Sequence, residues 1–578
     1  MIHRHTYTTL LRHASVLIVL IASFAAHASP QYFIVGNTQG GQGHCEYETI
    51  QSALDAALAN GPDLDYVFVT NTNSYANQAL VVGNQSVLIE GGYDDCDLSS
   101  PGPSASIVGD YAHSVIDIQT GVSTGRSITL RHLDLSGGDA PFGGALHILG
   151  TAYVLIEGVV MHDNNATYGG GISSAQATLA IGKDVAILNN IARRQGGGMY
   201  LQGGTVHIQN DRTTIGSNLA KYDPANLPSG LGGGIYATRF GTTPLDILIG
   251  PWQYQAGDPR PPISGFAISN NRADDRGGGI YLDGPSVSFL ALETSLTSNS
   301  AANSGGAVFI YNGGSLQMSR DFPGSPAVPQ CPNYLQCNVI RGNSVDTHNN
   351  YVAAGGAINV QVGTVRLIQT AMLQNSADSG SAINVGNISG APNPPNTIRL
   401  QGALISRNNC MHGSNFRPCS TIDLGAGADT RISYSTLADN THASGSSPAE
   451  IYSYSGVGSS LTLLSSILQS SAGVPIVFQG GATSYQTDCV ISSNSALMMG
   501  TRSQVGVPGF NNPAKFDYRL RSKSLATDYC DNANTLNDDF TDLVLIARGF
   551  EDAQHGNLYG RFDIGAFESD HIFGGGYE

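Results

Sequence analysis

Small-residue triplets followed by an apolar residue recur along the middle of this chain, and they constrain its fold more than any other feature. The triplets consist of glycine and alanine at 143–145, 169–171, 196–198, 232–234, 277–279, 305–307 and 355–357, with a degenerate Gly-Ser-Ala at 380–382. The apolar residues that follow them are Leu146, Ile172, Met199, Ile235, Ile280, Val308, Ile358 and Ile383. Four of the intervals between these residues span 25–28 residues, which indicates a stacked repeat with occasional inserted loops.

An asparagine element precedes most of the triplets. It is Asn-x-Ala or a close variant at 164–166, 190–192, 218–220, 271–273, 299–301, 343–345 and 375–377. Two short β-branched runs lie between triplet and asparagine, for instance Thr205–Ile208 and Thr213–Ile215. This pattern predicts three short strands per repeat and a three-sided coil. Asparagine tolerates left-handed backbone angles and can bond to stacked copies of itself, while glycine allows sharp bends and close packing.

These features predict an all-β fold, a right-handed parallel β-helix solenoid with a short N-terminal capping helix. A glycine-rich linker is the alternative, but it would lack Ile, Val and Leu at fixed offsets. The helix is expected over Thr49–Leu58, with Ile50, Leu54 and Leu58 on one face. The repeat fades at about Phe516, so residues 29–515 are assigned to the β-helix and 516–578 to a C-terminal cap or anchor-like module.

The first 28 residues have the pattern of a signal peptide. Arg4 and Arg12 precede an apolar run over 14–26, and Ala26-His27-Ala28 fits a cleavage site before Ser29. An uncleaved anchor is the alternative. No later run approaches ~18 apolar residues, so no transmembrane span is expected in the mature chain. The sequence therefore predicts a protein that is secreted or displayed on the outer cell surface.

The charge balance argues against nucleic acid as a partner. The chain carries 27 basic and 44 acidic residues, a net charge of −17, and the signal peptide contains two of the arginines and no acid. Phosphate contacts need a basic footprint, which this composition lacks. A disordered chain is also disfavoured, because 41% of the residues are apolar.

All eight cysteines lie in the exported part, and an even count in an oxidising compartment favours disulfides. Cys331 with Cys337, and Cys410 with Cys419, are close in sequence. Sequence does not fix the connectivity, but Cys45–Cys96 and Cys489–Cys530 are the natural remaining pairs. Zinc is the competing interpretation, and no Cys-x-x-Cys or paired-histidine spacing supports it.

The Asn-x-Ala…Gly-Gly-Gly-Ile repeat resembles the short repeats of polymorphic outer membrane proteins, within the pectin-lyase-like superfamily of bacterial parallel β-helix proteins. The opening segments, Thr49–Leu58 after Cys45 and Gly91-Gly92-Tyr93 before Cys96, are similar to those of many exported solenoids. Near the other end, 517–520 and 563–568 resemble the closing module of choice-of-anchor β-helix proteins. The resemblance implies the fold, but the superfamily includes lyases, hydrolases and adhesins, so it leaves the function open.

The sequence gives no positive evidence of catalysis. It contains no Gly-His-Gly, no Asn-Thr-Asp and no Arg-x-Pro-x-x-Arg. The adjacent Asp274 and Asp275 fall at a corner of the repeat, where a solvated pair is favoured over a hydrolase pair. No cofactor is expected. Calcium is possible around Asp94, Asp95 and Asp97, although clustered acids in a loop are usually just solvated.

Two insertions are the most informative candidate site. Each follows the second strand of its repeat, and a single short rung, at about 280–304, separates them. They are therefore expected to project from one corner about 10 Å apart. Aromatic, acidic and arginine side chains there could form a sugar-stacking groove, in which the candidate ligand-binding residues are Trp252, Tyr254, Asp258, Arg260, Arg320, Asp321 and Tyr334. The alternative is that these loops only shield strand edges.

The sequence thus favours an adhesin-like interaction protein that binds carbohydrate or another partner. A polysaccharide lyase or glycoside hydrolase is the second interpretation, and a structural envelope protein is the third. Clustered carboxylates with Lys or Arg on one face would favour the enzyme. A face of stacked Ser, Thr and Asn would favour binding.

Overall fold

The computed structural model describes most of the chain after the expected signal peptide. The described residues are 29–37, 45–99, 102–122, 125–209, 211–250, 266–320, 335, 338–346, 353–386, 395–411, 419–443, 449–454, 459–470, 475–479, 484–494, 500, 502–531, 541–544, 548–549 and 556–568. Residues 1–28 lie outside them, so the signal-peptide prediction stays a prediction.

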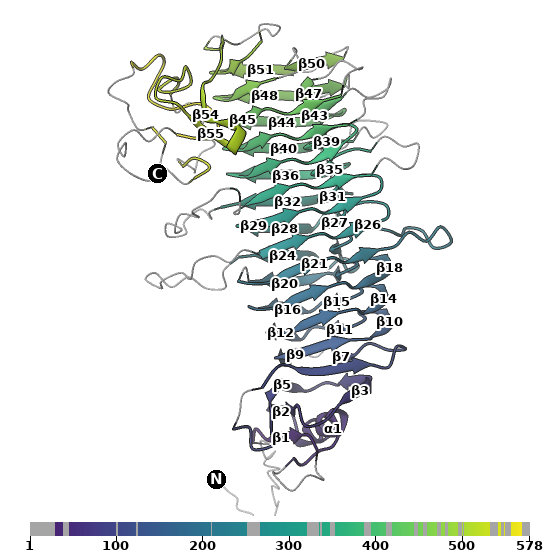
Figure 1. Ribbon diagram of the computed structural model, residues 1–578. Helices are drawn as coiled ribbons and strands as arrows, with labels where there is room; N and C mark the ends of the chain where they lie inside the picture. The colour runs from purple at the N-terminus through teal and green to yellow at the C-terminus, as the bar shows by residue number, and fades with distance from the viewer. Residues whose placement is uncertain are drawn as a thin grey trace, which may run out of the picture.

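Four long sheets of parallel strands stack into a parallel β-helix, as predicted (Figure 1). Sheet A has 15 strands. In order of pairing they are β1 (Tyr32–Val35), β2 (Leu64–Thr70), β5 (Ser86–Tyr93), β8 (Ser127–Arg131), β12 (Tyr153–Glu157), β16 (Thr178–Ile181), β20 (Gly204–Ile208), β24 (Leu245–Ile249), β28 (Val287–Leu292), β32 (Gly314–Ser319), β36 (Gly363–Ile368), β40 (Asn396–Gln401), β44 (Ala428–Ser433), β48 (Ser460–Leu464) and β51 (Ser484–Asp488).

Sheet B follows sheet A in each turn and also has 15 strands. They are β3 (Tyr75–Gln78), β6 (Ala105–Gly109), β9 (Leu133–Ser136), β13 (Val160–His162), β17 (Ala186–Leu188), β21 (Thr214–Gly216), β25 (Phe266–Ser269), β29 (Thr294–Thr297), β33 (Val339–Arg341), β37 (Ala371–Leu373), β41 (Leu404–Ser406), β45 (Thr436–Ala438), β49 (Ile467–Gln469), β52 (Ile491–Ser492) and β53 (Gln504–Val505).

Sheet C precedes sheet A in each turn and has 13 strands. They are β4 (Leu80–Val82), β7 (Ile116–Gly121), β11 (Leu146–Gly150), β15 (Ile172–Ala175), β19 (Met199–Gln202), β23 (Ile235–Thr238), β27 (Ile280–Asp283), β31 (Val308–Tyr311), β35 (Ile358–Val360), β39 (Ile383–Val385), β43 (Ser420–Leu424), β47 (Ala449–Tyr454) and β50 (Ile476–Gln479).

A fourth sheet, D, corrects the expectation of three strands per repeat. It has 10 strands: β10 (Asp139–Phe142), β14 (Asn165–Tyr168), β18 (Ile191–Gln195), β22 (Leu219–Ala220), β26 (Arg272–Ala273), β30 (Ser300–Ala301), β34 (Ser344–Val345), β38 (Ser376–Ala377), β42 (Asn409–Cys410) and β46 (Thr441–His442). Seven of these strands, β14, β18, β22, β26, β30, β34 and β38, begin with the two residues that follow the asparagine of the predicted element. Most span only two residues, too few for a recognisable alternation of apolar and polar positions.

The glycine triplets form the corner between sheets D and C. Glycine is required at the first and second positions for different physical reasons. The first glycine of every triplet has a left-handed backbone, with φ between 56° and 72°, which favours glycine. The second is fixed by stacking. A Cβ on Gly170 would lie closer than 3.0 Å to the carbonyl oxygen of Gly197 in the next rung, and the same holds for Gly197 against Gly233.

The asparagines form a continuous hydrogen-bonded ladder at the corner between sheets B and D. Each side-chain Nδ2 donates to the Oδ1 of the next asparagine over 2.9–3.1 Å. The ladder continues past the predicted series to Asn408 and Asn440. All of its members are buried: Asn164, Asn190, Asn218, Asn271, Asn299, Asn343, Asn375, Asn408 and Asn440. The corner assignment from sequence is therefore confirmed.

The predicted helix is present at the N-terminal end, as α1 (Ile50–Asn60). Thr49 caps it by accepting a hydrogen bond from the backbone N–H of Ser52. The buried face consists of Ile50, Ala53, Leu54 and Ala57. Leu58, expected on that face, is 47% exposed instead.

The C-terminal module lies along the flank of the solenoid, where a cap on the last rung was expected. It comprises the described residues from Phe510 to Glu568, and begins with the antiparallel strands β54 (Phe510–Asn512) and β55 (Asp517–Leu520) on either side of a 3-10 turn, η1 (Pro513–Lys515). Its apolar side chains pack on outward residues of sheet B, from Val339 in β33 to Ile491 in β52. Figure 1 shows the module, in yellow, beside the last rungs.

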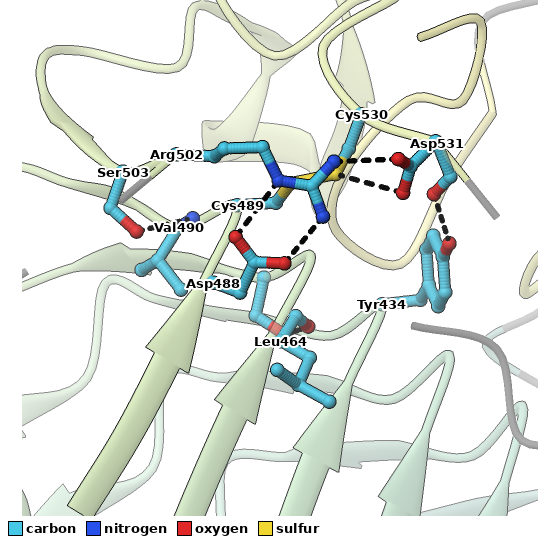
Figure 2. The surroundings of a disulfide bond; sticks show 10 residues. Tyr434, Leu464, Asp488, Cys489, Val490, Arg502, Ser503, Cys530 and Asp531 are labelled. Atoms are coloured by element: carbon cyan, nitrogen blue, oxygen red, sulfur yellow. Dashed lines mark hydrogen bonds and ion pairs between the residues drawn. A yellow bond between two sulfur atoms is a disulfide. The ribbon is translucent and has the colours of Figure 1, made fainter. Parts of the chain in front are cut away.

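Polar contacts and a disulfide attach the module to the solenoid. Arg502 donates to Asp488 at the end of β51 and to Asp531 of the module, and Cys489 is bonded to Cys530 beside them (Figure 2). The Phe516 ring lies 4.1 Å from the guanidinium carbon of Arg407. These contacts hold the module against sheet B at the flank of the solenoid.

Three of the four expected disulfides are formed: Cys45–Cys96, Cys410–Cys419 and Cys489–Cys530. Cys331 and Cys337 lie outside the described residues. Within the described part of the chain, no helix is long and apolar enough to cross a membrane.

Candidate functional site

The two insertions singled out from the sequence leave the solenoid where expected. One lies between β24 and β25 and the other between β32 and β33, so both leave the corner between sheets A and B. In sheet A only β28 separates β24 from β32, which confirms the spacing of two rungs. The candidate residues Trp252, Tyr254, Asp258, Arg260, Asp321 and Tyr334 lie outside the described residues, so the groove stays a prediction.

Arg320 is the one candidate residue of this group that the structure places. Its side chain is 1% exposed, and its Nη1 donates to the carbonyl oxygen of Leu543 over 2.6 Å. It therefore ties the last residue before the second insertion to the C-terminal module. A buried guanidinium engaged by the module is poorly placed to meet a ligand.

The outer face of sheet A presents a row of arginines. In β36 the side chains alternate, so Val365 and Leu367 enter the core while Thr364 and Arg366 point outward. The register then pairs Arg366 with Arg399 and Arg399 with Arg431. Three guanidinium groups thus stand on successive strands about 4.8 Å apart. We call these three residues the arginine row.

A second outward row lies beside the arginines and is rich in hydroxyl groups. Its members on consecutive strands are Ser315, Thr364, Thr397, Asp429, Ser460 and Ser484. We call this set the hydroxyl row; Asp429 is its one charged member. Hydroxyl groups donate and accept hydrogen bonds, so the two rows together offer both cations and hydrogen-bonding partners on one face.

The middle arginine is ion-paired within the site. The guanidinium of Arg399 donates to the Asp429 carboxylate and, over 2.8 Å, to the Asp429 carbonyl oxygen. The hydroxyl of Ser460 donates to the other carboxylate oxygen over 2.6 Å. Burial acts to raise the pKa of Asp429, but the hydrogen bonds from Arg399 and Ser460 outweigh it, so the pKa lies below its ordinary value. Asp429 is therefore ionised at neutral pH.

The outer two arginines of the row differ in their surroundings. Burial, and then the positive charge of Arg399, lower the pKa of Arg431 from its ordinary value. Arg366 has no hydrogen bond or ion pair with the described residues. Like charges opposite one another on neighbouring strands destabilise a sheet. Such a row in a chain with a net charge of −17 favours an anionic ligand.

The aromatic stack on the outer side of sheet C is a weaker candidate. Tyr200, Tyr236, Tyr281 and Phe309 stack with ring centroids 5.0–5.4 Å apart. They are at most 7% exposed, so a sugar ring cannot reach their faces. The stack fills the angle between sheets D and C, and its role is packing.

The acidic pairs weighed from the sequence have structural partners. Asp274 accepts a hydrogen bond from Arg272, and Asp275 from Asn303. Asp95 accepts from the hydroxyl of Ser99. No group of three or more His, Cys, Asp or Glu side chains suited to a metal ion occurs among the described residues. Calcium binding around Asp94, Asp95 and Asp97 stays an expectation from the sequence.

Sequence reasoning missed the arginine row, although a signal for it exists. The segments Thr-Val-Arg-Leu at 364–367, Thr-Ile-Arg-Leu at 397–400 and Asp-Thr-Arg-Ile at 429–432 place arginine between two inward apolar or threonine positions. Aligning the repeats on these segments would have stacked the arginines. The glycine triplets cannot serve for this alignment, because they end before the last two arginine strands.

Comparison of the sequence with protein-family models and with curated proteins finds no match. The functional assignment of this parallel β-helix therefore rests on the geometry of its own faces.

Proposed function

We propose that this protein is a secreted or cell-surface interaction protein, adhesin-like, that binds an extended anionic polysaccharide along the outer face of sheet A. The arginine row carries the proposal. Guanidinium groups pair with carboxylate and sulfate through planar, often bidentate hydrogen bonds. A row along the solenoid axis suits a polymer that presents its anions at regular intervals.

The hydroxyl row supports a carbohydrate over other anionic polymers. Extended glycans carry hydroxyl groups on every residue, and Thr364, Thr397 and Ser460 lie where such groups could exchange hydrogen bonds. Direct contact of nucleic acid with the same arginines is disfavoured, because the surrounding surface of so acidic a protein would repel a dense line of phosphates.

Several features support export. The leader over 1–28 has the charge, apolar run and small residues of a signal peptide. Three disulfides agree with folding in an oxidising compartment. The repeat resembles that of polymorphic outer membrane proteins, and the segments at 517–520 and 563–568, which resemble a choice-of-anchor module, pack into the lateral C-terminal module. We propose that this module serves attachment near the cell surface.

A polysaccharide lyase is the second candidate, because of Arg431. Lyases of this fold use a basic residue as proton acceptor, and burial together with Arg399 lowers the pKa of Arg431. The arginine row and the hydroxyl row together contain a single carboxylate, that of Asp429. They therefore lack the cluster of carboxylates that would favour an enzyme. Incubation with polyuronates would decide the matter, since eliminative cleavage creates an unsaturated product that absorbs ultraviolet light.

The binding proposal is tested by calorimetry with the mature protein and two anionic glycans, polygalacturonate and hyaluronan. The double variant R366A/R431A is expected to lose binding about tenfold or more, since each guanidinium–carboxylate contact contributes on the order of 1 kcal/mol. Binding should also weaken as salt is raised. The matched control is R212A, whose side chain is exposed and paired with Asp184 far from the row. Equal affinity of both variants and wild type would overturn the assignment.

A further inference from the structure

We infer that the bound glycan is a long linear chain that lies lengthwise on sheet A and is held along its interior over about ten sugar residues. This inference rests on the proposed function and narrows its ligand class from anionic glycans in general to long chains. It follows from the hydroxyl row, which does not stop at Ser315 but continues on six more strands toward the N-terminal end.

The register of sheet A carries the row upstream from Ser315 without a gap. On each strand from β28 back to β8, the paired outward position holds an oxygen-bearing side chain. These side chains, which we call the upstream row, are Ser288, Asp246, Thr205, Thr178, Tyr153 and Ser127. The hydroxyl row and the upstream row together form one line on 12 consecutive strands. At about 4.8 Å per strand, this line is about 53 Å long.

The sheet itself does not require such a composition. The outward positions two residues further along β12, β24 and β28 hold Leu155, Leu248 and Leu290, which are half-buried. Apolar side chains are thus accommodated on the same face, one row away from the oxygen-bearing line. A sugar ring has hydroxyl groups at its edge and C–H groups on its faces, so a line of oxygens beside leucines matches both parts of the ring.

Hydroxyl groups of the upstream row can reach a ligand. Thr178 and Thr205 are exposed, and within the described part of the chain their hydroxyls form no hydrogen bond. Ser288 differs, because its hydroxyl donates to the Asp246 carboxylate over 2.5 Å. That carboxylate keeps lone pairs that can accept from sugar hydroxyls. The upstream strands therefore offer donors and acceptors to a chain that lies along them.

The spacing of the line explains why a long chain is favoured. An extended pyranose chain advances by about one strand spacing per sugar, so each added sugar reaches the oxygen-bearing side chain of the next strand. A tetrasaccharide over the arginine row covers β36, β40, β44 and one further strand. A dodecasaccharide that starts there also covers the upstream row. A site confined to the arginines and a site that follows the whole line therefore differ in which chain lengths meet the upstream residues.

The experiment measures binding of oligosaccharides of four and twelve sugars, prepared from polygalacturonate and from hyaluronan, by calorimetry with the mature protein. The variant T205E places a carboxylate in the line four strands from Arg366, about 19 Å away. A tetrasaccharide over the arginines does not reach this strand, so its affinity should stay within about twofold of wild type. The dodecasaccharide does reach it and should bind at least about fivefold more weakly.

The control is T214E, which adds the same charge in β21 of the same turn but on the outer face of sheet B. It should leave both affinities unchanged. The double variant T178A/T205A removes two exposed hydroxyls without adding charge. It should weaken dodecasaccharide binding about threefold or more and leave the tetrasaccharide unaffected. Circular dichroism checks that every variant keeps the β fold.

The outcomes separate the two claims. Binding of neither dodecasaccharide by the wild-type protein would overturn the proposed function and this inference with it. Dodecasaccharide binding that is unaltered in T205E and in T178A/T205A would overturn the lengthwise site and leave the anionic-glycan function standing. A loss that is confined to the dodecasaccharide in both variants and absent in T214E supports the inference.

Discussion

Glu450 stands at the end of the asparagine ladder, in a position that is glycine or alanine in the triplets and threonine, Thr421, in the preceding rung. Its carboxyl accepts hydrogen bonds from Asn440 and Thr421, and it is 0% exposed. Burial raises its pKa to about 8, although those two hydrogen bonds act in the opposite direction. His442 likewise takes the place of an alanine, two rungs after Ala377, and burial lowers its pKa to about 4.

We expect Glu450 to make folding stability depend on pH. Its folded pKa of about 8 lies above the ordinary 4.5, so the folded state holds the proton more tightly, and the free energy of unfolding falls as pH rises between these values. His442 has the opposite effect near its ordinary pKa of 6.5, and about one pH unit above that value it is almost wholly neutral in both states. Between about pH 7.5 and 8 the wild type should therefore lose up to about 1.4 kcal/mol per pH unit through Glu450.

The variant E450Q should remove that slope and be the more stable protein at pH 7.5, because glutamine is neutral and can still accept from Asn440. Urea unfolding at several pH values measures both effects. Parallel losses of stability in E450Q and wild type would show that another group titrates.

At the scale of elements, the outer residues of sheet B decide where the C-terminal module docks. Upstream, the outward row contains Ala186 in β17, Thr214 in β21 and Ala267 in β25. Under the module the same row contains larger apolar residues such as Leu404 and Ile467, both buried. The change from small or polar to apolar residues follows the module's footprint, because water no longer reaches that part of the sheet.

We expect L404D to release the module, since it leaves an unpaired carboxylate in the apolar contact at a cost of about 3–5 kcal/mol. Limited proteolysis, read on reducing gels because Cys489–Cys530 keeps the fragments joined, should then cut between the solenoid and the module. A186D, in the same row but outside the footprint, should be cut no faster than wild type. Resistance of L404D equal to that of A186D would contradict the docking argument.

Some of these structural elements could be predicted from the sequence alone and others could not. The positions of the corners and of α1 could be predicted from the sequence. Gly170 allows the backbone of the next rung to approach closely, Thr49 caps the helix, and both effects are local. The arginine row was missed, because each arginine is a single residue in its own strand and they come together only when the strand segments are aligned with one another. Leu404 was equally hidden, since an apolar residue under a lateral module has the same sequence pattern as one in the core.

At the scale of the whole molecule, the asparagine ladder is a chain of side-chain hydrogen bonds that runs through nine successive rungs of the described solenoid. Each member donates to the next and also to a backbone carbonyl; Asn408, for example, bonds Asn440 and Met372. Because a solenoid has contacts only between neighbouring rungs, its cooperativity depends on such links from rung to rung.

We therefore expect N408A to cost about 3 kcal/mol, because it leaves buried partners on both neighbouring rungs unsatisfied. The adjacent residue supplies a matched control: Asn409 is exposed, and N409A should change stability by less than about 0.5 kcal/mol. Urea unfolding followed by circular dichroism compares them, and N408A should show a lower midpoint or a second transition. Indistinguishable curves for the two variants would mean that the ladder contributes little.

A ladder in which every member recognises only its own copy also makes length an adjustable property. Asn271 and Asn299 are 28 residues apart, and they form the same Nδ2-to-Oδ1 hydrogen bond as the other neighbours in the series. Deleting residues 271–298 would place Asn218 next to Asn299, which offers the same hydrogen-bonding groups as Asn271. The ladder would then remain continuous. The distance from α1 to the arginine row could thus be shortened or lengthened by whole turns of the solenoid, without any change to the residues of the row.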